Sequence, residues 1–201
     1  MLDEELRRGT KPLYGPVARM LARRGFTGEA VTGIGLGVGV ACLVAVALGF
    51  NLLALVLWLG NRLFDGLDGE VARLRGETSE YGAFLDIVAD FFVYGGLLAA
   101  LAIQHPEARL ALAVLYFAYY LNGSFFLALS GILERLKAER LTERGLHFRR
   151  SLAEGFETIV AGVLFLLFPA HVSLVAWVFA AMVFVSAAQR LLDARRMLEQ
   201  G

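Results

Sequence analysis

Cysteine and histidine are scarce in this chain of 201 residues, which contains one cysteine, Cys42, and three histidines. Cys42 lies inside an apolar run, so a disulfide is excluded and a small core residue is the better interpretation. Net charge is absent as well, because 19 basic residues balance 19 acidic ones. The charge total favours no particular partner, and nothing in it points to nucleic acid. The first residues, MLDEELRRGTK, lack the apolar stretch of a signal peptide, and we expect none.

Apolar residues are abundant. They make up 58% of the chain, and the mean hydropathy is +0.63, which is too apolar for an ordinary soluble domain. Crossing a hydrocarbon core of about 30 Å takes roughly 20 apolar residues, and about six such runs fit in the chain. The sequence therefore predicts an all-α integral membrane protein with a cytoplasmic N-terminal segment at 1–30, six transmembrane helices within 31–194, and a cytoplasmic tail at 195–201.

The six expected spans follow one another with short connections. They cover residues 31–50, 51–72, 82–103, 110–132, 156–168 and 172–192. Before them, residues 12–24 place apolar side chains at helical spacing among arginines, and Gly25 follows as a stop. This pattern favours an amphipathic helix in the membrane interface, although a basic flank that anchors the first span fits equally well.

Glycines occupy alternate positions in the first expected span, at Gly33, Gly35, Gly37 and Gly39. A nucleotide-binding glycine loop would need another glycine where Val38 stands, and it would need a preceding strand. Close packing of helices is the better interpretation of these glycines.

The distribution of basic residues predicts the orientation in the membrane. Only Arg109 lies in or beside the two short turns at 104–109 and 169–171, and the other eighteen of the 19 basic residues lie on the opposite side. By the positive-inside rule, the termini, the 73–81 link and the 133–154 connection are cytoplasmic.

Four aspartates, Asp65, Asp68, Asp86 and Asp90, lie in segments otherwise suited to lipid. Buried carboxylates are costly in such segments and usually mark a site. On a helix Asp65 and Asp68 share a face, and Gly82, Asp86 and Asp90 form one stripe on the next helix. Two antiparallel helices can direct both faces into one cavity open to the cytoplasm.

Four neighbouring carboxylates repel one another and need compensation. Hard divalent cations such as Mg²⁺ or Mn²⁺ supply it, and paired carboxylates on two helices suit a two-metal site for phosphoryl chemistry. The absence of nearby histidine and cysteine argues against zinc. Two alternatives remain open from the residues alone, namely solvated acids at helix ends and a multi-pass transporter with a proton or cation pathway.

The spacing of this segment resembles a known signature. The segment reads Asp65-x-x-Asp68-Gly69-x-x-Ala72-Arg73, then eight residues, Gly82, three residues, Asp86, three residues and Asp90. All eight positions match the signature of the CDP-alcohol phosphotransferase family, and chance matches of this length are rare. The resemblance implies an integral membrane enzyme, most often a homodimer, that moves a substituted phosphate from a CDP-linked donor to an alcohol and releases CMP.

The resemblance also implies residue roles. Asp65, Asp68 and Asp86 correspond to ligands of two divalent cations, and Asp90 corresponds to a ligand that is also the general base. The nucleotide would contact Asp68, the small residues Gly69, Ala72 and Gly82, and the motif arginine, Arg73.

The acceptor is weakly specified by the sequence. Thr32 is a candidate phosphate contact, and Arg149 and Arg150 could bind a phosphorylated acceptor, although basic residues that set the topology explain the pair as well. We expect CDP-diacylglycerol as donor and glycerol 3-phosphate as acceptor, in a prokaryotic cytoplasmic membrane. Inositol phosphate, serine or an archaeal lipid donor are the alternatives.

Overall fold

The computed structural model describes residues 14–139 and 155–199. Within these residues the chain is all-helical, as predicted, and contains no strand. The helices are residues 14–23, α2 (Gly28–Ala47), α3 (Asn51–Arg75), α4 (Glu80–Gln104), α5 (Arg109–Glu139), α6 (Gly155–Leu167) and α7 (Val172–Glu199), with short 3₁₀ turns η1 (Pro106–Ala108) and η2 (Pro169–His171).

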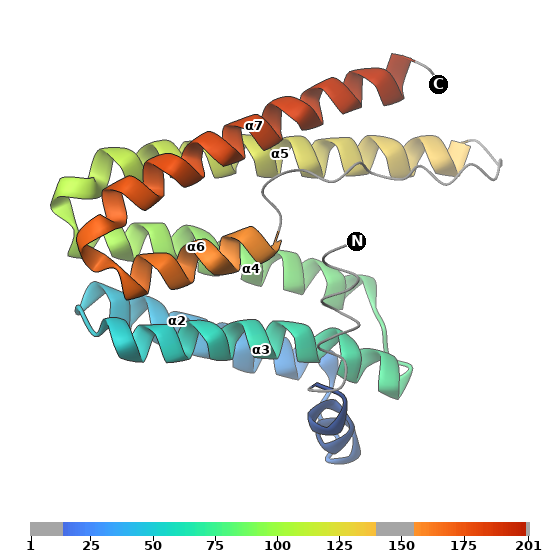
Figure 1. The fold of residues 1–201 in the computed structure, drawn as a ribbon. Helices are drawn as coiled ribbons and strands as arrows, with labels where there is room; N and C mark the ends of the chain where they lie inside the picture. The colour runs from blue at the N-terminus through green and yellow to red at the C-terminus, as the bar shows by residue number, and fades with distance from the viewer. Residues whose placement is uncertain (1–13, 140–154, 200–201) are drawn as a thin grey trace. The chain divides into compact units, whose positions relative to one another are not determined.

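The helices form two units that are described separately. Unit 1 comprises Met1–Gln104 and Gly162–Pro169, and unit 2 comprises His105–Ala161 and Ala170–Gly201. In unit 1, α2 packs against both α3 and α4 (Figure 1). In unit 2, α5 packs along α7.

Local signals explain where the helices of unit 1 begin and end. Thr27 caps α2, because its side chain accepts a hydrogen bond from the Ala30 N–H at 3.1 Å. Three glycines at the helix ends, Gly25, Gly49 and Gly76, have positive φ angles of 87°, 82° and 67°, a conformation that residues with a side chain rarely adopt.

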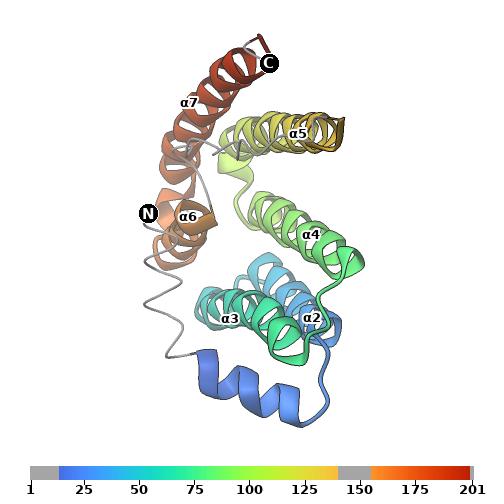
Figure 2. The same ribbon diagram turned by 90° about the vertical axis from the view of Figure 1, so that its right-hand side faces the viewer.

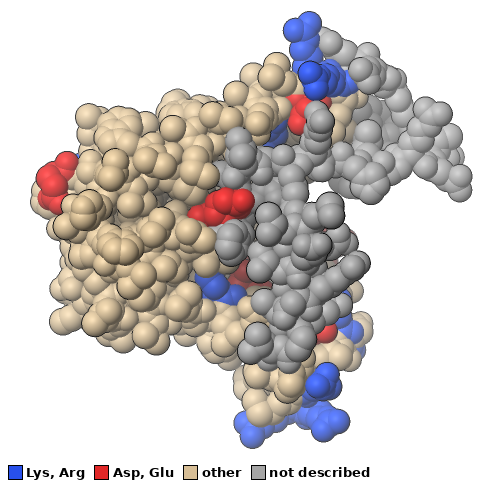
Figure 3. Space-filling view, in the orientation of Figure 1, with Lys and Arg blue, Asp and Glu red and all other residues tan. Residues whose placement is uncertain are grey.

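Residues 14–23 form a helix that runs across the end of the α2–α3 pair (Figure 2). Its Ala18 is fully buried in a small apolar cluster with Val31, Leu67 and Val71. The helix expected around residues 12–24 is therefore present in the described part and packs on α2 and on α3, the helix that carries Asp65 and Asp68. In the space-filling view, basic side chains cluster at this lower end, whereas the surface over α2 and α3 is mostly uncharged (Figure 3).

Four helical segments are long and apolar enough to cross a membrane, namely Gly28–Ala47, Glu80–Gln104, Pro106–Leu133 and Pro169–Leu198. The chain is thus an integral membrane protein by composition, and large apolar side chains such as Leu52 and Leu110 are more than 70% exposed. The other two expected spans do not meet the same standard. α3 has sufficient length but carries charged residues along its second half, and the apolar part of α6, Glu157–Leu167, is too short.

The prediction that all four alternating glycines serve close packing is half right. A Cβ added at Gly35 would come within 2.9 Å of Phe64 Cβ, and one at Gly39 within 2.6 Å of Val93 Cγ2. Added Cβ atoms at Gly33 and Gly37 would meet nothing within 4 Å. The reason is helical geometry, because residues four apart share a face whereas residues two apart do not.

Candidate functional site

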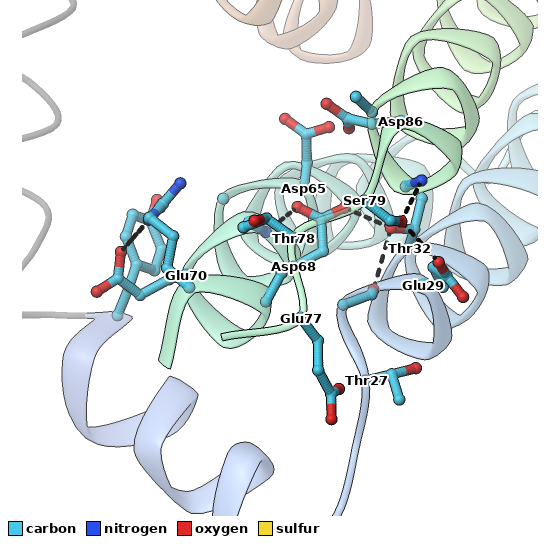
Figure 4. Close-up of a pocket in the computed structure, with 18 residues that line it drawn as sticks. Thr27, Glu29, Thr32, Asp65, Asp68, Glu70, Glu77, Thr78, Ser79 and Asp86 are labelled. Carbon is cyan, nitrogen blue, oxygen red and sulfur yellow. Dashed lines mark hydrogen bonds and ion pairs between the residues drawn. The ribbon is translucent and has the colours of Figure 1, made fainter. Parts of the chain in front are cut away.

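A pocket of about 400 Å³ opens between the N-terminal end of α2, the second half of α3 and the start of α4. Three of the four aspartates line it, Asp65, Asp68 and Asp86. Five further residues singled out from the sequence also line it, namely Thr32, Gly69, Ala72, Arg73 and Gly82. Figure 4 shows Asp65, from α3, and Asp86, from α4, pointing toward one another.

Small residues allow the elements around the pocket to approach closely. A Cβ added at Gly28 would lie 2.9 Å from Ala72 Cβ, so the start of α2 lies directly against α3. The link before α4 is tied to α2, because Ser79 Oγ donates to Glu29 Oε1 at 3.0 Å and accepts from the Gly82 N–H at 2.9 Å. The motif positions Ala72 and Gly82 therefore shape the pocket wall.

The Asp68 carboxylate is fixed by neutral donors. Thr32 Oγ1 lies 2.7 Å from Asp68 Oδ2, and the Gly69 N–H donates to Oδ1. Asp68 is only 6% exposed, and these two hydrogen bonds offset part of the cost of burying its charge. The Thr32 hydroxyl also lies 3.1 Å from the Gly28 carbonyl oxygen. Thr32, a candidate phosphate contact from the sequence, thus positions Asp68 in this structure.

The Asp90 carboxylate is held by a cation instead. Arg62 Nη1 donates to Asp90 Oδ1 at 2.8 Å and lies 3.8 Å from Asp65 Oδ2. Asp90 is absent from the pocket lining, whereas Asp65 belongs to it. The guanidinium of Arg62 therefore links the pocket to Asp90.

The rim of the pocket carries exposed ion pairs. The guanidinium of Arg73 contacts Glu70 Oε2 at 2.8 Å, and Arg75 holds Glu77 in a pair of hydrogen bonds at 2.6 and 2.7 Å. Hydrogen bonding to Arg75 lowers the pKa of Glu77 below its usual range. Arg73 lines the pocket as the signature requires, with its charge directed to Glu70. Arg149 and Arg150 lie outside the described residues.

The carboxylates offer only oxygen donors, which is the chemistry that Mg²⁺ and Mn²⁺ prefer. As the described residues stand, no three of their acidic, histidine or cysteine side chains are gathered closely enough to hold an ion. Asp68 and Asp90 are held instead by protein partners, Thr32 and Arg62. The donor chemistry of the aspartates fits a divalent cation.

Sequence reasoning missed the residues that hold the aspartates in place. Arg62 received no role, although it lies three residues before Asp65 and so shares its helical face. Tyr94, one turn after Asp90, had no signal in the pattern of acids and small residues, yet its hydroxyl contacts Arg62 Nη1. Asn61, which is 4% exposed, binds the same guanidinium.

Comparisons with known proteins agree with the geometry. The family model described as CDP-alcohol phosphatidyltransferase matches residues 29–188. The chain is 38% identical to Inner membrane protein YnjF of Escherichia coli, over 95% of this chain and 94% of that protein. It is 33% identical to the phosphatidylinositol phosphate synthase of Mycobacterium marinum, over 88% of this chain and 76% of that protein.

Solved structures show the same fold. The crystal structure of the phosphatidylinositol phosphate synthase of Mycobacterium tuberculosis with CDP-DAG bound superposes with a TM-score of 0.73 at 24% identity, covering 89% of this chain and 92% of that one. The structure of the same protein in complex with manganese and citrate also gives a TM-score of 0.73, with 89% of this chain and 87% of that one covered.

Proposed function

Because the chain belongs to the CDP-alcohol phosphatidyltransferase family, we propose that it transfers a phosphatidyl group from CDP-diacylglycerol to a small alcohol and releases CMP. The observation that carries this proposal is the pocket itself. Seven of the eight signature positions line a single cavity of about 400 Å³, and the eighth, Asp90, shares the guanidinium of Arg62 with Asp65. Family membership favours this enzyme over the transporter that the acids alone left open.

The cation site would be formed by the four signature aspartates. Asp65, Asp68 and Asp86 line the pocket, and Asp90 shares the Arg62 guanidinium with Asp65. Bound Mg²⁺ or Mn²⁺ would neutralise the pyrophosphate of the donor and stabilise the leaving CMP. A manganese complex of a structural relative supports this choice of metal, and we propose two ions because four carboxylates exceed what one ion needs.

The nucleotide would bind against the small residues of the pocket wall. Gly69, Ala72 and Gly82 leave room for a flat base and a pyrophosphate where longer side chains would clash. Asp68, fixed by Thr32, would contact the same end of the donor. The two acyl chains would stay in the bilayer beside the exposed apolar side chains of the helices.

The transfer would be an in-line displacement at the phosphorus nearest the lipid. The acceptor oxygen forms a bond to that phosphorus, the bond from phosphorus to the oxygen of CMP breaks, and the acceptor hydroxyl proton passes to Asp90. Asp90 is partly exposed, with 31% of its side chain accessible. A small alcohol can therefore reach it from outside the protein.

We propose a phosphorylated alcohol as acceptor. Glycerol 3-phosphate was expected from the sequence, and the relative named phosphatidylinositol phosphate synthase supports inositol phosphate equally. Arg149 and Arg150 are the candidate phosphate contacts, and serine is the uncharged alternative.

The membrane placement is part of the same proposal. We propose six spans, which include α3 and α6, a homodimer, and termini and site on the cytoplasmic side. Residues 14–23 would lie in the interface. Their helix runs across the end of the α2–α3 pair (Figure 2), Ala18 faces the protein, and Arg19 and Arg23 are exposed.

Purified protein should be incubated with CDP-diacylglycerol, Mn²⁺ or Mg²⁺, and glycerol 3-phosphate, inositol phosphate or serine, and CMP release measured. We expect CMP with one of the acceptors. Asp90→Asn should lower that rate by about 10²-fold or more, whereas Asp193→Asn, which removes an acid on α7 paired only loosely with Arg196 at 3.9 Å, should not. Full activity in Asp90→Asn would refute the role of Asp90 as the base.

A further inference from the structure

We infer that Arg62 is a positioning residue that fixes one oxygen of Asp90 and thereby reserves this carboxylate for proton transfer. The inference rests on the proposed function, because Asp90 is the base only in that reaction. Arg62 lies outside the eight signature positions, and the sequence pattern gave it no role. Its assignment comes from the contacts around it.

Every part of the Arg62 guanidinium is engaged. Nε and Nη2 donate to Asn61 Oδ1 at 3.0 and 2.5 Å, and Nη1 donates to Asp90 Oδ1 at 2.8 Å and contacts the Tyr94 hydroxyl. The group also lies over two aromatic rings, 5.4 Å from the centroid of Trp58 and 4.6 Å from that of Tyr94.

The partners of Arg62 are themselves anchored to the framework of unit 1. Asn61 Nδ2 donates to the Gly35 carbonyl at 2.8 Å, which ties the guanidinium to α2. The contacts thus run from Gly35 on α2, through Asn61 and Arg62 on α3, to Asp90 on α4. A planar guanidinium held on three sides leaves its remaining partner, Asp90 Oδ1, little freedom to rotate.

Stability alone does not account for a cation at this place. Arg62 is 8% exposed, and burying an arginine costs several kcal/mol unless its partners compensate. An apolar residue packed against Trp58 would hold the helices together at least as well. What an apolar residue cannot do is orient Asp90 and sit beside Asp65.

The position of Arg62 has a consequence for metal binding. The guanidinium and a divalent cation are both attracted by Asp65 and Asp90, so they compete for these carboxylates and repel one another. With Arg62 in place, Asp90 offers a cation one oxygen, and Asp65, Asp68 and Asp86 remain the stronger ligands. Loss of Arg62 should therefore act in opposite directions on metal affinity and on turnover.

The test compares Arg62→Gln and Arg62→Lys with the wild-type protein in the same detergent, using Mn²⁺ as the probe. Mn²⁺ affinity is measured by electron paramagnetic resonance without substrate, and kcat by CMP release. For Arg62→Gln we expect Mn²⁺ binding that is unchanged or up to about tenfold tighter, because a repelling charge is gone. We expect kcat to fall at least about tenfold. Arg62→Lys keeps the charge without the planar fork and should give wild-type Mn²⁺ affinity with an intermediate kcat.

Arg196→Gln is the matched control, since it removes an exposed arginine on α7, and both measurements should stay at wild-type values. A purely structural role for Arg62 predicts that Mn²⁺ binding and kcat fall together with the folded fraction. That joint loss, or a kcat of Arg62→Gln within about threefold of wild type, would overturn the inference.

If Arg62→Gln does not fold, the inference is tested with Arg62→Lys and Tyr94→Phe. Tyr94→Phe keeps the ring under the guanidinium and removes the hydroxyl contact, so kcat should fall about threefold or more with Mn²⁺ affinity within twofold. Wild-type kcat in both variants would overturn the inference. Wild-type protein that releases no CMP with any acceptor would instead refute the proposed function, and the Mn²⁺ affinity of the Arg62 variants would still test the competition.

Discussion

Thr32→Val is the most informative single change in the pocket, because it removes one hydroxyl and keeps the shape of the side chain. Thr32 Oγ1 lies 2.7 Å from Asp68 Oδ2, in a place where Asp68 is 6% exposed. A hydrogen bond to a charged group contributes about 1.5–3 kcal/mol. Since about 1.4 kcal/mol corresponds to a factor of ten, the variant should lose roughly 10- to 100-fold in kcat/KM for CDP-diacylglycerol.

The variant should also lose some stability, because Asp68 stays buried with one donor fewer, and the fall in kcat/KM should be larger than the change in folded fraction explains. Asp68 keeps its bond from the Gly69 N–H, so the carboxylate stays buried but loses its preferred rotamer. The assay is CMP release over a series of CDP-diacylglycerol and Mn²⁺ concentrations, with thermal unfolding in detergent measured in parallel.

Thr158→Val provides the matched control for Thr32→Val. Thr158 is a buried threonine of unit 2, 8% exposed, whose hydroxyl accepts from Tyr119 at 3.0 Å. It has a comparable hydrogen bond that is distant in sequence from the aspartates. Its removal should lower the stability of unit 2 and change kcat/KM less than threefold. Equal kcat/KM in the two variants, or wild-type kcat/KM in Thr32→Val, would show that the Thr32 contact does not position Asp68 for the reaction.

Two further predictions concern packing and metal. Gly39→Ala should destabilise the protein by about 1–3 kcal/mol, because the new methyl group would lie 2.6 Å from Val93 Cγ2. Gly37→Ala should be tolerated, because its new methyl group would meet nothing within 4 Å. Equal melting temperatures for the two variants would contradict the packing argument. Treatment with EDTA should abolish CMP release, and addition of Mn²⁺ should restore it in a concentration-dependent way, whereas activity that survives EDTA would argue against a metal-dependent reaction.

The helices of this protein could largely be predicted from the sequence, because the run of apolar residues sets the length of a helix and glycine marks its end. The expected first span ended at Phe50, and α2 ends at Ala47, just before the positive-φ Gly49. A span and its helix need not end together. The expected sixth span ended near Leu192, and helix α7 continues to Glu199, because a polar segment without glycine or proline can remain helical after the apolar run is over.

The arrangement within the site could be predicted only in part. Spacing alone placed Asp65 with Asp68 and Asp86 with Asp90, since residues three and four apart share a helical face. No local pattern specifies the register between α3 and α4. This register decides which carboxylate is buried and which residue holds it. Arg62 and Asp90 are 28 positions apart, and their pairing is a result of that register.

The register gives the four aspartates different surroundings, and this difference suggests which of them bind metal and which accepts the proton. Asp65 and Asp86 point toward one another in Figure 4, so a divalent cation would relieve the repulsion between their carboxylates. Asp68 is anchored by neutral donors and can bind a cation without giving them up. Asp90 already has a cation beside it in Arg62, and so it gains least from a metal. Arg62 holds Oδ1 of Asp90 in place, so the direction of the other carboxylate oxygen is set as well, and we therefore expect Arg62 to aim Asp90 at the acceptor hydroxyl.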